Sequence, residues 1–410
     1  MNTNPRAGQR RHRQDPVIPP QSALSTAIVA HVAAQIPGAA RLSLPLLAKR
    51  VADDVSQLSE FFTSDREELP PAYLSRPATR CAYLLYFGSI GAACVQQALD
   101  FAGKWPLVGD RPLRILDVGA GPLVATLGVV ERLGPAALVD VTAVDGSRRT
   151  MEDGAAVLRA VSPLAKVQLK SGNFREGNFW RDAVVGQYDM ILLANVLNEW
   201  QMGGHTKASA ADFVQRLLQN HLAENGVAVL VEPATRWGSH TLIKVREHLA
   251  QATEPLAFRV IAPCCGAVQC PLANNQRDWC FSEQPWRRPA HVEAIDAAIG
   301  HRRATLKFSY LVIGHGDSKA KHRVIGGVMR DRGVLRRYVC TQEGRVVAMS
   351  AESRAPSWLK QAWRGDPVAI AQPAVMAGDG NRHELVVDVG FKGSPAPVVA
   401  PSRSAKTKRS

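Results

Sequence analysis

The chain has 410 residues, of which 46% are hydrophobic and 21% are charged. This composition excludes a disordered polyelectrolyte and a collagen-like or coiled-coil rod, and the length leaves room for two or three domains. No stretch approaches the roughly 18 uncharged apolar residues of a membrane span, so no membrane association is expected. The first residues lack the apolar run of a secretory signal, which favours a cytosolic protein. Their Arg-rich, acid-poor composition makes an organelle transit peptide the second interpretation.

Positive charge is concentrated in three places. The formal net charge is +14, and residues 1–14 and 391–410 hold basic side chains and no acidic one. Within 318–337, one acidic residue, Asp331, accompanies seven basic residues: Lys319, Lys321, Arg323, Arg330, Arg332, Arg336 and Arg337. Such an excess favours a polyanionic partner, whose bound counterions are released on binding. A solvated, solubilising surface explains charge runs about equally well.

The two ends of the chain differ in composition from its interior. Residues 1–20 and 393–410 are rich in Pro, Ser and basic residues and are expected to be disordered. Residues 21–110 have apolar positions recurring every three or four residues, which predicts a helical region.

Apolar strands alternate with amphipathic helices from residue 111 onwards. Strands are expected at 112–118, 137–144, 165–170, 188–194 and 226–232, and helices near 122–133, 147–160, 206–222 and 238–252. This alternation predicts an α/β domain over 111–315, with a doubly wound parallel sheet that a strand at 306–314 completes. A Cys-rich segment at 261–289 interrupts the alternation, and a small, mostly antiparallel β-rich domain with a short helix is expected at 316–392.

A glycine-rich turn follows the first predicted strand. Asp117, Gly119 and Gly121 stand between that strand and an apolar helix, where glycines let the backbone approach a ligand closely. The third glycine of a dinucleotide-binding turn is replaced by Val124. An acidic residue before the glycines instead suits the ammonium group of S-adenosylmethionine (SAM). The alternative is a turn that serves chain geometry alone.

Polar residues also follow the next two strands. Asp145 ends the second strand and is placed to accept hydrogen bonds from both ribose hydroxyls, and Asn173 follows the third strand and is placed to meet the adenine amino group. Together with the glycine turn and the strand order, these residues resemble the class I (Rossmann-like) methyltransferase family over about 112–315. The resemblance implies SAM as cofactor, bound by Asp117, Gly119, Gly121, Asp145, Asn173 and Asn195.

The end of the fourth strand is where methyltransferases usually place the acceptor. Asn195, Asn198 and Glu199 are polar enough to hold a substrate and are the candidate catalytic residues. No pair of prolines follows the Asn, unlike in many enzymes that methylate exocyclic base nitrogens. Helix capping or cofactor contact explains these side chains at least as well.

Seven cysteines are present, and four of them crowd into one short segment. Four thiolates, from Cys264, Cys270, Cys280 and the distant Cys340, would complete a zinc site or an iron–sulfur cube. No two of the four are two to four residues apart, as structural zinc sites usually require, so the cluster is favoured. Cys265 is an alternative ligand to Cys264, whereas Cys81 and Cys94 fit small buried apolar residues in helices.

Cys264 also has a second interpretation. Pro263-Cys264 looks like the nucleophile dipeptide of RNA cytosine-C5 methyltransferases, in which a thiolate attacks the base. In that family the dipeptide follows the fourth strand, whereas here it lies beyond the fifth. A ligand role is therefore favoured.

Several longer stretches carry a more specific resemblance. PCCGAVQCPLANNQRDWCFSEQPWRRP, KFSYLV, RRYVCTQEGRVV and WRGDP resemble the methyltransferase-like assembly factors of the small ribosomal subunit, found in bacteria and mitochondria. YLSRPATRCAYLLYFGS resembles the helical region of that family, and the similarity spans roughly 70–370. The chain departs from the family pattern at Cys265, which replaces a His-containing stretch, and in a longer third ligand spacing.

That resemblance implies a function and a location. It implies a [4Fe–4S] cluster held by Cys264, Cys270, Cys280 and Cys340, with zinc as the alternative, and a SAM-binding fold that docks on small-subunit ribosomal RNA. The protein would act in ribosome assembly and translation, in the bacterial cytoplasm or alternatively in the mitochondrial matrix. An active rRNA methyltransferase with a structural metal, and a non-catalytic metal-dependent RNA-binding module, remain alternatives.

Overall fold

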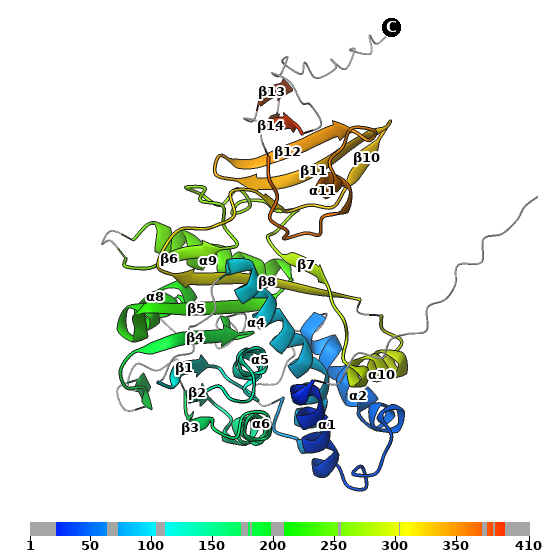
Figure 1. Ribbon diagram of the computed structural model, residues 1–410, viewed down its shortest axis with the longest axis vertical. Helices are drawn as coiled ribbons and strands as arrows, with labels where there is room; N and C mark the ends of the chain where they lie inside the picture. Colours follow the sequence, from blue (N-terminus) through cyan, green and yellow to red (C-terminus); the bar gives the residue numbers. More distant parts are fainter. Residues whose placement is uncertain are drawn as a thin grey trace, which may run out of the picture.

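The structure, a computed structural model, describes residues 22–63, 73–103, 111–173, 179–180, 183–197, 209–252, 256–302, 304–370, 375–379 and 382–389. The two tails predicted at 1–20 and 393–410 lie outside these ranges. One large sheet with helices on both faces forms the body of the protein, and a second, smaller sheet stands beyond one edge of it (Figure 1).

The large sheet has the strand order β3-β2-β1-β4-β5-β8-β6. Its parallel strands are β1 (Leu113–Val118), β2 (Val139–Asp145), β3 (Lys166–Ser171), β4 (Tyr188–Ala194) and β5 (Leu222–Pro233). Antiparallel to β5 runs β8 (Thr305–Gly314), which also pairs with β6 (Arg259–Ala262) and β7 (Ser282–Pro285). This is the class I methyltransferase arrangement, and the predicted fold class is confirmed.

Helices cover both faces of this sheet because its central strands are apolar on both sides. Adjacent residues of β1 show the alternation: Ile115 packs into a core under α5 (Val124–Leu133) and α6 (Arg148–Val161), and Leu116 into a core under α8 (Ala210–His221) and α9 (Arg236–Ala250). All four crossover helices predicted from the sequence are present.

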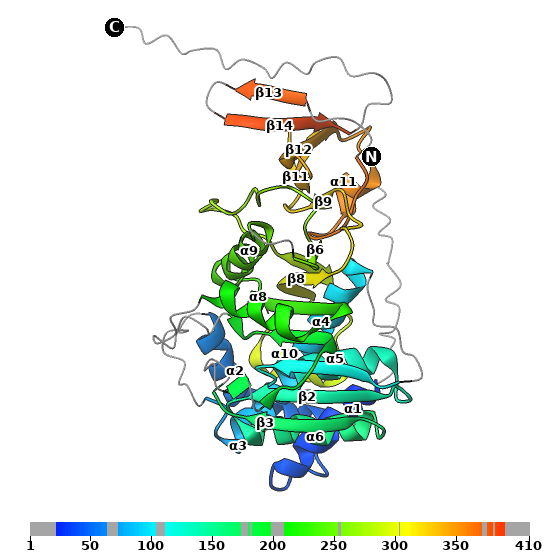
Figure 2. The ribbon, with the colours of Figure 1, turned by 90° about the vertical axis from the view of Figure 1, so that its left-hand side faces the viewer.

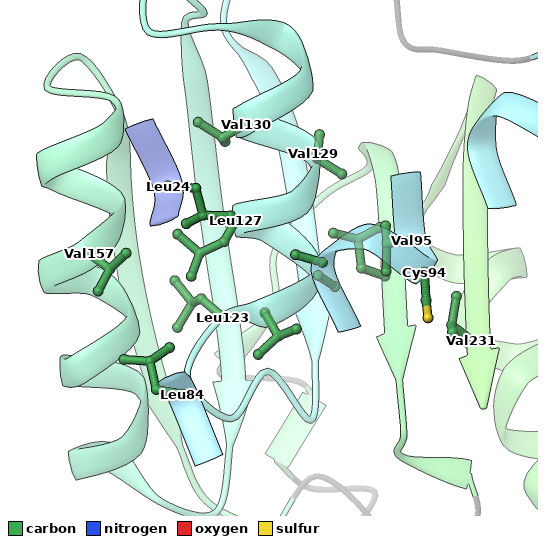
Figure 3. Packing of buried hydrophobic residues seen from close by; sticks show 14 of the residues in the cluster. Leu24, Leu84, Cys94, Val95, Leu123, Leu127, Val129, Val130, Val157 and Val231 are labelled. Atoms are coloured by element: carbon green, nitrogen blue, oxygen red, sulfur yellow. The ribbon is translucent and has the colours of Figure 1, made fainter. Parts of the chain in front are cut away.

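The predicted helical region consists of α1 (Ala23–Gln35), α2 (Leu44–Thr63), α3 (Pro77–Ala82), a π-helical stretch η2 (Tyr83–Gly88) and α4 (Ser89–Ala102). These helices share the α5 and α6 side of the sheet. In Figure 3, Leu24 of α1 and Val157 of α6 lie close to Leu127 of α5, within one continuous core. A further helix, α10 (Ala290–Ile299), was not predicted from the sequence and packs against α2.

One helical stretch meets the criteria for a membrane span. Residues 77–102 are long and apolar enough by length and composition, contrary to the expectation from the sequence. In the most apolar window of 18 residues, 61% of the stretch is buried inside the protein. Its apolar character is that of a core helix, since α4 packs against α5 and β8.

The smaller sheet follows β8 in the chain. It contains β9 (Arg323–Val324), β10 (Met329–Asp331), β11 (Val334–Thr341), β12 (Gly344–Ala351), β13 (Val375–Asp379) and β14 (Arg382–Asp388), with α11 (Ser357–Gln361) against it. Its pairs are antiparallel except β12 with β14. The sheet stands beyond the β6 edge of the large sheet (Figures 1 and 2).

Candidate functional site

A cavity of about 680 Å³ opens at the carboxyl ends of β1, β2 and β4. The order of the strands reverses between β1 and β4, and open α/β sheets bind ligands at such a point. All six residues predicted to bind the cofactor line this one cavity: Asp117, Gly119, Gly121, Asp145, Asn173 and Asn195. The fold therefore brings together side chains from four separate strand ends.

The glycine turn has a conformation that other residues adopt at a cost. Gly119 and Gly121 have φ values of +63° and +49°. A Cβ atom on Gly119 would lie 2.4 Å from Cγ2 of Val196, in the loop after β4. The turn is also tied to β2, because the Gly121 N–H donates to the Asp145 carboxylate over 2.9 Å. Glycine at 119 thus permits two ligand-facing loops to meet.

Two carboxylates of the cavity have raised pKa values. Burial raises the pKa of Asp117 to about 7, although its carboxylate accepts hydrogen bonds from the Thr126 hydroxyl (2.7 Å) and backbone N–H (3.3 Å). Burial also raises the pKa of Asp145, and the N–H groups of Ser147 and Gly121 oppose that increase. An uncompensated buried carboxylate of this kind favours a cationic or hydrogen-bond-donating ligand.

The end of β4 contributes Asn195, which has a left-handed backbone conformation with φ of +61°. Its N–H donates to the carbonyl of Val231 on β5 over 2.8 Å. Two residues later, the N–H of Leu197 donates to the buried carboxylate of Glu232 over 2.8 Å. The other two catalytic candidates, Asn198 and Glu199, lie outside the described residues. Asn195 is therefore the catalytic candidate that can be placed at the cavity.

The helical region supplies part of the cavity wall, which sequence reasoning missed. Tyr73, Leu74, Ser75 and Tyr83 all line the cavity. Tyr73 and Tyr83 belong to an aromatic group with Phe62 of α2, with ring centroids 5.8 and 6.2 Å from that ring. The signal was present in the stretch YLSRPATRCAYLLYFGS, but periodicity alone shows only helices there.

A second, much smaller cavity gathers the cysteines. Five cysteines line it together with two arginines: Cys264, Cys265, Cys270, Cys280, Cys340, Arg246 and Arg323. The first four lie in or beside the turns at 263–281, between β6 and β7, whereas Cys340 comes from β11 of the smaller sheet. Residues far apart in sequence thus meet at one place.

Hydrogen bonds fix the cysteine segment onto the large sheet. The carbonyl of Cys280 accepts from the hydroxyls of Ser239 on α9 (2.8 Å) and Ser309 on β8 (2.9 Å). The N–H of Cys270 donates to Glu247 of α9 over 2.8 Å. Cys340 is held differently, since its strand pairs with Arg323 of β9. The cavity therefore joins the two sheets.

The thiols of this cavity are poor acids. Burial raises the pKa of Cys264 far above its ordinary value, against the nearby charge of Arg246, and raises that of Cys280 to about 12. Burial also raises the pKa of Cys270, while a hydrogen bond with Cys265, followed by burial, raises that of Cys340. A thiol of this kind loses its proton when its sulfur binds a metal centre.

The structure bears on the predicted metal centre. Among the described residues, no group of three or more His, Cys, Asp or Glu side chains is arranged to hold a metal ion. The small cavity is nonetheless lined by the cysteines, with the buried Arg246 and Arg323 beside them. Cysteine thiolates are ligands in both zinc sites and iron–sulfur clusters. Cys264 does not line the large cavity, which disfavours its interpretation as a nucleophile.

The predicted basic surface at 318–337 is only partly a surface. Arg323 is buried, with its guanidinium 4.5 Å from the ring centroid of Phe101, and it donates to the carbonyl of Gly365. Arg337 is also buried and donates to Ala362. Because both arginines donate to backbone carbonyls inside the protein, and Arg323 also stacks on a ring, they are structural. The sequence shows that these residues are charged, but it does not show that their side chains point into the protein.

Comparison with known proteins assigns the chain to a family. A family model described as mitochondrial small ribosomal subunit Rsm22 matches residues 77–364, which include all the residues that line the cysteine cavity and most of those that line the large one. The chain belongs to this family. A search of curated proteins finds no match to this Rsm22 family member.

Several solved structures are similar in fold to this Rsm22 family member. A putative class I SAM-dependent methyltransferase from Listeria monocytogenes has 11% identity and a TM-score of 0.36, with 73% of this chain and 88% of that chain covered. Fibrillarin from Aeropyrum pernix, with natively bound SAM, has 17% identity and a TM-score of 0.28, with 39% and 66% covered. A putative rRNA methylase from Clostridium thermocellum has 12% identity and a TM-score of 0.30, with 55% and 97% covered. These similarities concern the fold alone.

Proposed function

We propose that this protein binds SAM and acts on the small ribosomal subunit, contacting its rRNA during assembly or translation, with an iron–sulfur cluster at the cysteine cavity. The observation that carries the proposal is the single large cavity lined by all six predicted cofactor residues. The Rsm22 family membership supports the small-subunit partner. The family name is mitochondrial, which favours the mitochondrial matrix over the bacterial cytoplasm as the site of action.

Each part of SAM has a chemically suitable neighbour in the cavity. The Asp117 carboxylate suits the ammonium group, because an adjacent cation offsets the cost of burying that charge. Asp145 stands at the end of β2, where its oxygens suit the two ribose hydroxyls, and Asn173 offers an amide to the adenine. The positive-φ turn at Gly119 brings the backbone close to the amino-acid part of the cofactor.

Calorimetry with SAM tests the cofactor proposal. We expect saturable binding to the full chain and a loss of at least about tenfold in affinity for Asp145→Ala, since a bidentate contact to the ribose would disappear. Asp140→Asn is the matched control, because Asp140 begins the same strand at the opposite edge of the sheet. Absence of heat and of saturable binding would leave the glycine turn with a purely structural role.

The cysteine cavity would hold the cluster through Cys264, Cys270, Cys280 and Cys340. When bound, the cluster would supply a rigid link between the two sheets. Arg246 and Arg323 supply positive charge beside the thiols, which favours the anionic state that metal ligation requires. Cys265 lines the same cavity and is the spare donor.

Anaerobic purification followed by absorbance and iron analysis tests the cluster. We expect a coloured protein with about four irons per chain, the content of a cube. A colourless, zinc-loaded protein would overturn the cluster and leave SAM binding as a separate matter. Replacing Cys265 by Ala is the control for ligand identity, since iron is retained if Cys264 is the ligand.

Methyl transfer is a further question for the same cavity. Asn195 is a hydrogen-bonding residue rather than a strong base, so we propose an assembly factor that retains cofactor binding ahead of an active rRNA methyltransferase. Labelled SAM incubated with purified small-subunit particles distinguishes the two. Label in the rRNA would favour the enzyme, and SAM binding without label would favour the assembly factor. Particle binding without SAM binding would favour a metal-dependent RNA-binding module.

A further inference from the structure

Two tryptophans are unusually exposed. Trp237 and Trp363 are 47% and 42% exposed, and they are the only aromatic residues among the large apolar side chains that are exposed in the described parts of the chain. Large aromatic rings are usually buried in the core of a domain. Their exposed ring faces are available to contact a ligand.

Trp237 lies close in the chain to the carboxyl end of β5. It is the second residue of α9, which begins three residues after the carboxyl end of β5. The neighbouring strand β4 ends at the cavity, where the Asn195 N–H donates to Val231 of β5. The indole therefore stands at the same edge of the sheet as the cavity, next to the position expected for a methyl acceptor.

Residues next to each tryptophan are hydrogen-bonded to one segment, 276–281. On the side of Trp237, the Trp279 indole N–H donates to the carbonyl of Ala234 over 3.0 Å, and Arg236 donates to Gln276. On the side of Trp363, the neighbouring Arg364 donates to Asp278 over 2.8 Å. The two exposed rings thus stand on a common, hydrogen-bonded support.

The exposed charges around the two rings are positive. Arg236 and Arg277 are exposed, whereas the carboxylate of Asp278 is paired with Arg364. The other nearby carboxylate, Asp366, accepts from the Trp363 N–H (2.7 Å) and from the Gln284 amide (2.8 Å). The acidic groups are thus satisfied within the protein, and the arginines face solvent.

We propose that Arg236, Trp237, Arg277 and Trp363 form a stacking ledge for unpaired nucleotides of an RNA strand. Exposed rings bind unstacked bases, and interleaved arginines bind the phosphates between them. A duplex does not fit, because its bases are already stacked. A protein partner is less suited, since the ledge offers cations without the enclosed apolar pocket of a protein hot spot. The ledge rests on the proposed function and specifies the form of RNA that approaches the cavity.

Fluorescence anisotropy with labelled single-stranded oligouridine and with a duplex of equal length tests the ledge. We expect the full chain to prefer the single strand, and Trp237→Ala and Trp363→Ala each to weaken binding by about tenfold, the effect of losing one base stack. Trp237→Phe should retain most of the affinity. Arg236→Gln should instead reduce the salt dependence, because one phosphate contact is lost.

Leu164→Ala is the matched control, because Leu164 is similarly exposed (56%) but precedes β3 at the opposite edge of the sheet. Equal affinity of both Trp variants and this control for the single strand would overturn the ledge. A preference for the duplex would also overturn it. So would Trp variants that bind RNA normally but bind ribosomal proteins, freed of RNA, more weakly. Pelleting with small-subunit particles separates the ledge from the proposed function. If the chain binds the particles but the Trp variants bind RNA normally, the ledge is wrong and the proposed function still stands.

Discussion

The large cavity and the cysteine cavity are built in opposite ways. The large cavity, about 680 Å³, is formed by short loops that directly follow β1, β2, β3 and β4. The cysteine cavity, about 30 Å³, needs the turns between β6 and β7 and a strand of the smaller sheet. The first depends on strand ends of one sheet, with part of its wall from the helical region, whereas the second exists only where two sheets meet.

This difference concerns what stabilises each cavity before any ligand binds. The large cavity is supported by backbone hydrogen bonds, such as those from Gly121 and Ser147 to Asp145. The cysteine cavity contains buried, protonated thiols, which are weak hydrogen-bonding groups. We infer that the large cavity is preorganised for its ligand, and that the small one gains much of its stability from the group that it holds.

The largest effect is expected for Cys280→Ala. If Cys280 is one of the four proposed ligands, its loss should release the metal and loosen the smaller sheet from the large one, because their connection includes Cys340. Iron analysis and limited proteolysis measure both effects. SAM binding should persist, since Cys280 does not line the large cavity. Loss of SAM binding together with the iron would contradict the independence of the two cavities.

A smaller but still large effect is expected for Gly119→Ala. The new Cβ would lie 2.4 Å from Val196, and the alanine would have to adopt the positive φ of this position. The cavity must therefore deform, and SAM affinity should fall by more than about tenfold. Gly300→Ala is the control, since Gly300 also has a positive φ (+73°) at the end of α10 but has nothing within 4 Å of a Cβ. Both variants should lose about 1 kcal/mol of stability from the backbone conformation. Equal SAM affinity in the two would refute the role of the glycine turn.

A moderate effect is expected from pH. Asp117 has a pKa of about 7 without ligand, raised first by burial and also by the charge of Asp145. Pairing with the SAM ammonium requires the ionised carboxylate, so affinity should fall by about tenfold from pH 7.5 to pH 6 as Asp117 takes up a proton. Calorimetry across this range measures it, and methylthioadenosine, which lacks the amino-acid part, is the control.

The variant Thr126→Val sharpens the pH test. The Thr126 hydroxyl donates to Asp117 and lowers its pKa, so its removal should move the loss of SAM affinity to higher pH. A profile that methylthioadenosine shares with SAM would show that some group other than Asp117 is titrating.

The same contrast between the cavities explains which site residues could be predicted from the sequence. Apolar periodicity located β1 to β5 and their helices, and strand ends in a parallel sheet place Asp117, Asp145 and Asn195 together without further information. A local sequence pattern is therefore enough to predict a site whose residues all follow neighbouring strands of one sheet. Family resemblance was needed to join Cys340 to the other cysteines, because no local rule links a strand to a distant loop.

The failures have physical causes of the same kind. Arg323 and Arg337 were predicted as surface charge, but both are buried and donate to carbonyl groups of neighbouring segments, and Arg323 also lies over the Tyr310 ring. Residues 77–102 read as an ordinary helical region, and only the packing shows an apolar core helix. Tyr73 and Tyr83 reach the large cavity from a region that periodicity assigns to scaffolding. In each case a tertiary neighbour, and not the residue itself, decides the role.

The smallest effect is expected for Cys94→Ala, which tests whether cysteines outside the small cavity are packing residues. Cys94 is buried in α4, near Val95 and Val231 in the core shown in Figure 3. Removing its sulfur should lower the free energy of unfolding by about 1 kcal/mol, as for other small core truncations. Urea denaturation measures the loss, and both iron content and SAM affinity should be unchanged. If iron were lost as in Cys280→Ala, the metal centre would depend on the large core, and the contrast between a preorganised cavity and a metal-dependent one would no longer hold.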